Sequence, residues 1–149
     1  MRVAHVRERH GAAGAPWRLA AASTWRDGPW LDLEVGRRRL LAADERRAHN
    51  SVLFRQPITT LDDHLARGLR IEALGEIVDG FAVTGGARDE DDEAVLVEAD
   101  LAFGPPILRP PSFRDFYAFE QHVATMWARR QSDIPEAWYR LPIFYFSNV

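Results

Sequence analysis

The chain has 149 residues, 46% of them hydrophobic and 28% charged, which is the composition of an ordinary folded domain with a packed core. A net charge of −3 argues against a nucleic-acid partner, which requires clustered positive charge, and the absence of cysteine excludes disulfides and thiolate sites. No apolar run is long enough for a signal peptide or a membrane span, so we expect a cytoplasmic protein without a membrane partner.

The first third of the chain predicts a small antiparallel sheet. Strands are expected at residues 2–8 and 17–22, joined by a glycine-rich turn at residues 11–14. A third strand is expected at residues 30–35, where apolar and acidic side chains alternate after the turn signal Asp27-Gly28-Pro29.

Helices are expected next, over residues 37–49 and, with stronger periodicity, over residues 60–78. Thr60 and Asp63 resemble a capping box at the start of the second helix. His64 lies beside the apolar stripe of that helix, where a hydrogen-bonded structural histidine is favoured over a metal ligand. The acidic run within residues 85–93 is expected to be a solvated loop, because it lacks the spaced ligands of a calcium loop.

A short strand is expected at residues 95–97, followed by an extended stretch rich in proline between Gly104 and Pro111 that would link two domains. The predicted fold class is α+β. We predict an N-terminal domain over residues 1–100, a small antiparallel sheet with packed helices, and the start of a second, incomplete domain over residues 101–149.

Ser112 and Asp115 have the spacing of a second capping box, which predicts a helix that continues through His122. On one helix these two side chains would lie on nearly the same face, about 10.5 Å apart along the axis, and could line one cavity. Equally, Asp115 could only complement the helix N-terminus while His122 is an ordinary surface residue. Spacing alone does not decide between these interpretations.

Several short motifs follow one another between residues 101 and 149. In order, they are Gly104-Pro105-Pro106, Arg114-Asp115-Phe116-Tyr117, His122, Ile134-Pro135, Trp138-Tyr139, Leu141-Pro142 and Phe144-Tyr145-Phe146-Ser147-Asn148. This series resembles the fumarylacetoacetate hydrolase family, and residues 1–100 would then be its variable N-terminal domain. The resemblance implies a mixed-β catalytic fold in a homodimer. It also implies a Mg²⁺ or Ca²⁺ ion and cleavage of a carbon–carbon bond in a β-diketone or acylpyruvate substrate, or related decarboxylase, isomerase or hydratase chemistry.

Within that resemblance, Asp115 matches a carboxylate on or near the metal, and His122 matches the histidine that activates the attacking water. Tyr117 matches a substrate-binding tyrosine. A substrate-binding arginine would align beside Arg130, one position off, so Arg129 and Arg130 are both candidates, although they could be only exposed charge. Glu136 lies where some members have the glutamate that pairs with the catalytic histidine, although it could equally be a favourable carboxylate in a first helical turn.

The family's principal metal ligands, a Glu-x-Glu pair on a strand and a later aspartate, would lie downstream of Asn148. Residues 143–146 predict an apolar core strand that further sheet would cover. We therefore expect the chain to be the N-terminal part of such an enzyme and inactive alone. A non-catalytic docking or oligomerisation module and an unrelated small ligand-binding domain are the alternatives.

Overall fold

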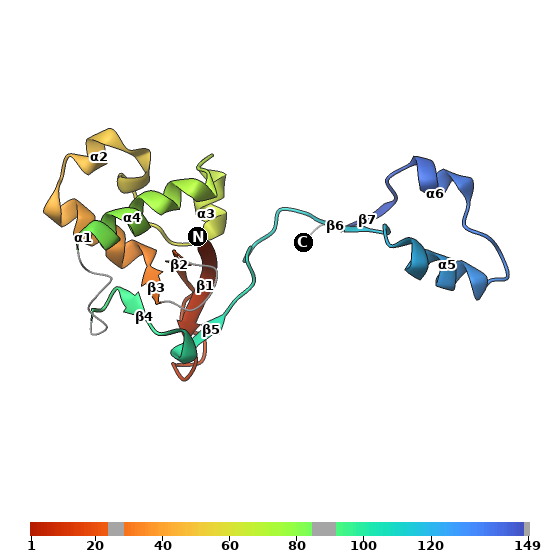
Figure 1. The fold of residues 1–149 in the computed structure, drawn as a ribbon, viewed down its shortest axis with the longest axis horizontal. Helices are drawn as coiled ribbons and strands as arrows, with labels where there is room; N and C mark the ends of the chain where they lie inside the picture. Colours follow the sequence, from red (N-terminus) through yellow and green to blue (C-terminus); the bar gives the residue numbers. More distant parts are fainter. Residues whose placement is uncertain (24–28, 85–91, 148–149) are drawn as a thin grey trace. The chain divides into compact units, whose positions relative to one another are not determined.

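The computed structural model describes residues 1–23, 29–84 and 92–147, and the chain divides into two compact units, Met1–Leu108 and Arg109–Val149 (Figure 1). We call them unit 1 and unit 2. The expected turn at Asp27-Gly28 and most of the expected acidic loop lie outside the described residues. No helix among the described residues is both long and apolar enough to cross a membrane.

Unit 1 is an α+β fold around a curled antiparallel sheet. Its five strands are β1 (Arg2–Glu8), β2 (Arg18–Ala22), β3 (Trp30–Asp32), β4 (Val95–Leu96) and β5 (Leu101–Phe103). The strand order is β4-β3-β2-β1-β5, and every neighbouring pair is antiparallel. The expected strands near the N-terminus are thus confirmed, and β5 extends the sheet beyond residue 100.

The strand expected over residues 30–35 was wrong after Asp32, because that residue begins a helix. One oxygen of its carboxylate accepts the backbone N–H groups of Glu34 and Val35, both at 3.1 Å, and so caps α1 (Leu33–Ala43). Such a cap satisfies donors that have no partner inside the helix. The alternating pattern therefore continued past the point where the backbone changes conformation.

The single helix expected over residues 60–78 was also wrong, because it is divided into three. They are α3 (Leu61–Ala66), the 3-10 helix η2 (Ile71–Leu74) and α4 (Gly75–Val83). Thr60 does cap α3, since its hydroxyl accepts the N–H of Asp63 at 3.1 Å. The break falls at Gly68, whose φ of 74° lies in the left-handed region where glycine is favoured.

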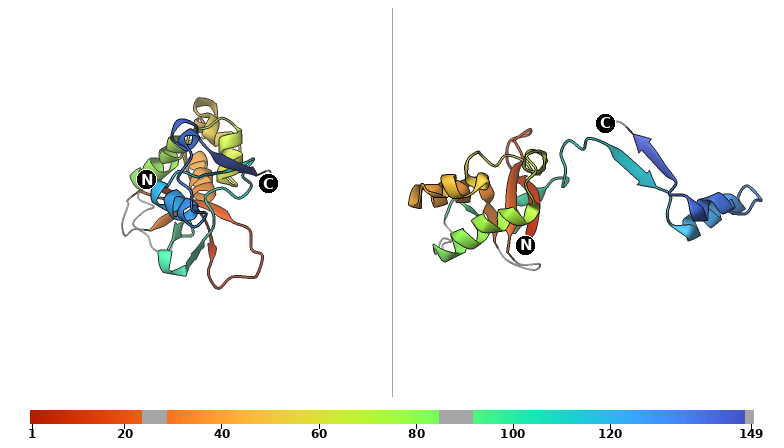
Figure 2. Two further views of the ribbon diagram at one scale, coloured as in Figure 1. Left: turned by 90° about the vertical axis from the view of Figure 1, so that its right-hand side faces the viewer. Right: turned by 90° about the horizontal axis from the view of Figure 1, so that it is seen from above.

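Two apolar clusters lie on opposite faces of the sheet. Leu19 and Ala21 of β2 face the helices, and Ala20 and Ala22 face the other side, as the alternation of a strand requires. Figures 1 and 2 show α1 and α4 (orange and green) together on one side of the strands. The described part of unit 1 also contains shorter helical segments, namely α2 (Arg47–Asn50), η1 (Val52–Phe54) and η4 (Glu98–Asp100).

Unit 2 consists of a two-stranded antiparallel sheet and two short helices. The strands β6 (Phe113–Phe116) and β7 (Phe144–Ser147) pair with each other, and α5 (Glu120–Ala128) and α6 (Glu136–Arg140) lie between them in sequence. The helix expected to begin at Ser112 was wrong, since this segment is β6 and the helix begins at Glu120. As a strand, this segment forms backbone hydrogen bonds with β7, so it needs no side-chain cap at Ser112.

Candidate functional site

The strand pairing of unit 2 assigns the expected site residue Asp115 to one face of the small sheet. Cross-strand partners share a face, so Asp115 lies beside Tyr145 and on the face opposite that of its neighbour Arg114. Asp115 and Tyr145 are both exposed, the latter at 69%. The core strand expected at residues 143–146 is a strand, but its side chains are not buried within unit 2.

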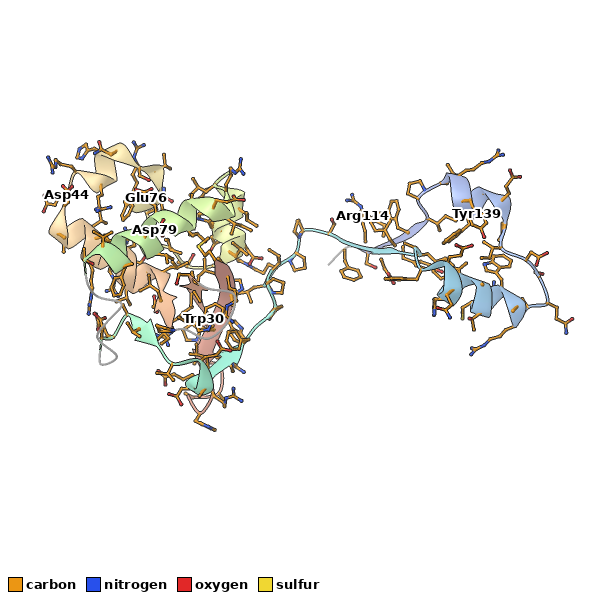
Figure 3. All side chains as sticks on the ribbon, in the orientation of Figure 1. Trp30, Asp44, Glu76, Asp79, Arg114 and Tyr139 are labelled. Carbon is orange, nitrogen blue, oxygen red and sulfur yellow. The ribbon has the colours of Figure 1, made fainter. Side chains whose placement is uncertain are left out.

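The opposite face carries Arg114 among aromatic rings. Its guanidinium lies 5.8 Å from the ring centroid of Phe144 and 5.2 Å from that of Phe146, and Phe116 contacts Phe144 at 5.1 Å between centroids. Figure 3 labels Arg114 on this strand. Asp115 and Arg114 therefore belong to different surfaces despite being adjacent in sequence.

Tyr117 and His122 are the two expected site residues that the structure brings into contact. Their ring centroids lie 6.2 Å apart at 87°, an edge-on arrangement. The N–H of Tyr117 donates to the carbonyl of Ile143 at 3.1 Å, which extends the β6–β7 ladder by one residue. His122 lies in the first turn of α5, and the fully buried Val123 beside it anchors that helix. Asp115 and His122 lie on different elements, so their expected helical relation was wrong.

Helix α6 docks against this segment through two side-chain hydrogen bonds. The indole N–H of Trp138 donates to the carbonyl of Tyr117 at 2.8 Å, and the hydroxyl of Tyr139 donates to Glu120 at 2.8 Å. The hydrogen bond to Glu120 retains the phenolic proton and raises the pKa of Tyr139 above its ordinary value. Figure 3 labels Tyr139 between the two helices.

An open hollow of about 600 Å³ lies between α5 and α6. Its lining includes Glu120, Ala124, Ala128, Ser132, Asp133 and Tyr139. Neither Asp115 nor His122 lines it, so the hollow is not a cavity shared by those two residues.

Glu136 and Arg130 have local partners. Glu136 is the first residue of α6, and its carboxylate pairs with Arg140 on the same helix. Among the described residues it makes no hydrogen bond to His122, so the histidine–glutamate pair stays a prediction. The guanidinium of Arg130 lies 5.6 Å from the ring centroid of Trp127, just after the end of α5.

The described residues do not by themselves fit a divalent ion. Within residues 1–23, 29–84 and 92–147 no three His, Asp or Glu side chains gather closely enough to hold one. Asp115 offers one carboxylate, with an aromatic residue as its cross-strand partner.

Sequence reasoning missed two features that organise unit 2. The first is the Glu120–Tyr139 hydrogen bond between α5 and α6, and the second is the position of Tyr145 opposite Asp115. Both depend on which segments pair across 19 to 30 residues of chain, and no local pattern reports that pairing.

Three comparisons with known proteins find no relative of this chain. A scan against protein-family models finds no match for this chain, and neither a search of curated proteins nor a search of solved structures finds one.

Proposed function

We propose that the chain is the N-terminal part of a fumarylacetoacetate hydrolase-family enzyme, which hydrolyses a carbon–carbon bond in a β-diketone or acylpyruvate substrate with Mg²⁺ or Ca²⁺. The observation that carries the proposal is the ordered series of motifs over residues 101–149. Two of its expected site residues, Tyr117 and His122, are also in ring contact. The complete enzyme would be a homodimer.

His122 is the proposed general base. An imidazole nitrogen can accept a proton from water and later return it, which suits the side chain to this role. The ring of Tyr117 lies edge-on to the imidazole, and the indole N–H of Trp138 donates to the carbonyl of Tyr117. Asp115 is proposed as one metal carboxylate, Tyr117 and Arg130 as substrate contacts, and Glu136 as a partner of His122.

The surface of unit 2 supports a role as part of a larger domain. Apolar side chains are exposed on both faces of the β6–β7 sheet and around it. They include Phe113, Phe116, Phe119, Leu141, Ile143, Phe144 and Phe146, each at least 40% exposed. Exposed apolar side chains that gather on a surface commonly mark an interaction site, and a two-stranded sheet is marginally stable alone. In the proposal, the remaining sheet of the catalytic domain covers these strands.

The same exposure favours a second candidate, a non-catalytic docking or oligomerisation module. An uncovered apolar strand pair is also a surface on which another protein adds strands. The two candidates differ in whether His122 matters, because a docking module needs the aromatic faces of β6 and β7 but not an imidazole in α5.

The experiment measures the cleavage of an acylpyruvate in the presence of Mg²⁺. It compares this chain with a continuous product, the longer protein that is translated through the downstream reading frame. We expect the chain to be inactive and the continuous product to be active. His122→Ala should reduce the activity of the continuous product by about 10²- to 10⁴-fold, the usual contribution of a general base. His49→Ala, an exposed histidine of α2, should leave it unchanged. Robust cleavage by this chain alone, or full activity of His122→Ala, would contradict the proposal.

A further inference from the structure

His5 is a fully buried histidine on β1 with both ring nitrogens in use. Its Nδ1 lies 2.9 Å from the carbonyl oxygen of Pro105, and its Nε2 lies 3.0 Å from the backbone nitrogen of Leu61. All three residues belong to unit 1, and they come from a strand, the start of α3 and the segment that follows β5.

The two partners determine the protonation of the ring. A backbone carbonyl only accepts hydrogen bonds and a backbone N–H only donates them, so Nδ1 must carry the proton and Nε2 must accept. Only the neutral Nδ1–H tautomer satisfies both contacts. A second proton on Nε2 would direct an N–H at the N–H of Leu61, and it would place an added charge in a fully buried site.

The contacts of His5 hold a defined segment of the chain, residues 104–108, which we call the connector. The backbone carbonyl of His5 accepts the N–H of Gly104 at 2.8 Å, and its ring binds Pro105. The N–H of Leu108 donates to Asp62 in the first turn of α3 at 2.9 Å. The connector is therefore bound at both ends, and the ring of His5 joins its first half to the helix that binds its second half.

We propose that His5 is a pH-sensitive link between the connector and α3. The neutral ring of His5 holds the connector on α3, and protonation of the ring releases the connector. The connector leads directly to Arg109, the first residue of unit 2, so acidification would free the segment from which unit 2 continues. This inference does not depend on the proposed enzymatic function.

Charged groups on the surrounding elements have other partners. Arg7 of β1 lies over Trp17, with its guanidinium 4.6 Å from the ring centroid, and Arg18 of β2 pairs with Asp32 at 3.3 Å. On α3, Asp62 accepts the Leu108 N–H, and Asp63 accepts the hydroxyl groups of Thr59 and Thr60. Attraction between these two carboxylates and a cationic ring would not restore the acceptor that Leu61 loses.

His64 provides a control within the same helix. It is also buried, at 3% exposure, but its Nε2 contacts the carbonyl of Arg70 at 2.8 Å and therefore acts only as a donor. A donor nitrogen keeps its proton in the cationic ring, so protonation of His64 leaves that hydrogen bond intact.

The test uses the full chain, labelled with ¹⁵N, and compares roughly pH 8 with roughly pH 5, which lie on either side of the point at which a free imidazole changes charge. At the upper pH, NMR of the ring nitrogens should show His5 protonated at Nδ1 only. On acidification, the hydrogen-exchange protection factors of the Leu61 and Leu108 amides should fall by about tenfold, since each release removes one hydrogen bond. In His5→Gln, whose amide donates and accepts without titrating, the protection should no longer depend on pH, whereas His64→Gln should keep the pH dependence.

Three results would overturn the proposal. They are a proton on Nε2 of His5 at the upper pH, unchanged protection of Leu61 across the titration, or the same pH dependence in His5→Gln. The measurements on the wild-type chain stand even where the glutamine variant does not fold.

Discussion

Replacing Glu34 by alanine removes a carboxylate that holds α1 to the segment before α3. Its two oxygens accept hydrogen bonds from Arg37 at 2.8 and 2.7 Å and from the N–H of Ile58 at 2.7 Å. The side chain of Arg37 is only 8% exposed, and its remaining hydrogen bond goes to the carbonyl of Phe54 at 2.9 Å. Glu34→Ala would therefore leave a nearly buried guanidinium without a counter-charge.

The expected cost follows from these contacts. Breaking a buried ion pair costs about 3–5 kcal/mol, and a side chain of Glu34 that is 27% exposed places this pair at the lower end of that range. We expect Glu34→Ala to lower the free energy of unfolding by about 3 kcal/mol. Urea unfolding followed by far-ultraviolet circular dichroism measures it, with the exposed Glu45→Ala as control. A loss no larger than that of Glu45→Ala would refute the reasoning.

The same carboxylate predicts a pH dependence. Burial raises the pKa of Glu34, but the hydrogen bonds from Arg37 and Ile58 and the charges of Arg37 and Arg38 outweigh it, so the pKa is lowered on folding. A lowered folded pKa stabilises the fold fully above the unfolded value, which is about 4.3, and this contribution is lost as the pH falls through the folded pKa. The stability difference between wild type and Glu34→Ala should therefore shrink only in acid.

Two further substitutions test the packing, one in each unit. Gly80→Ala would place a Cβ 2.9 Å from Cδ1 of the buried Leu40, and should lower the free energy of unfolding by about 1–3 kcal/mol in urea. Gly75→Ala in the same helix has no neighbour within 4 Å and should be neutral or slightly stabilising, so equal effects would contradict the close approach of α1 and α4. In unit 2, Trp138→Phe removes the indole N–H that donates to the Tyr117 carbonyl. The hydrogen-exchange rates of the backbone amides in α6 should then rise about fivefold. Unchanged rates would mean that this hydrogen bond does not hold α6.

The elements that could be predicted from sequence are those with local signals. The strand over residues 2–8 and the cap at Thr60 were confirmed, because alternation and capping act within a few residues. His64 was also predicted as a hydrogen-bonded structural histidine, and its bond to Arg70 bears this out.

The failures arose where two local signals competed or where partners were distant. The alternation after Trp30 indicated a strand, but the side chain of Asp32 stabilises a helix start instead. The spacing of Ser112 and Asp115 indicated a helix, but pairing with β7 makes this segment a strand. In both segments the spacing of the aspartate was compatible with more than one backbone conformation.

The candidate site shows the same limit. Helical spacing left open a cavity shared by Asp115 and His122, and the strand β6 removes that helical relation. The contact between Tyr117 and His122 was not predicted. Ring contacts of this kind follow from the turn between β6 and α5, whose course depends on the pairing of β6 with β7 and on the docking of α6.

The most direct test of the proposed function is the coding sequence immediately downstream of Val149. The proposal predicts an open reading frame that soon encodes a strand with a Glu-x-Glu pair, followed by a later aspartate. Together with Asp115, these residues would supply the oxygen ligands that Mg²⁺ and Ca²⁺ prefer. A stop codon at that position, or an open frame without the acidic pair, would contradict the proposal and favour a docking module built on β6 and β7.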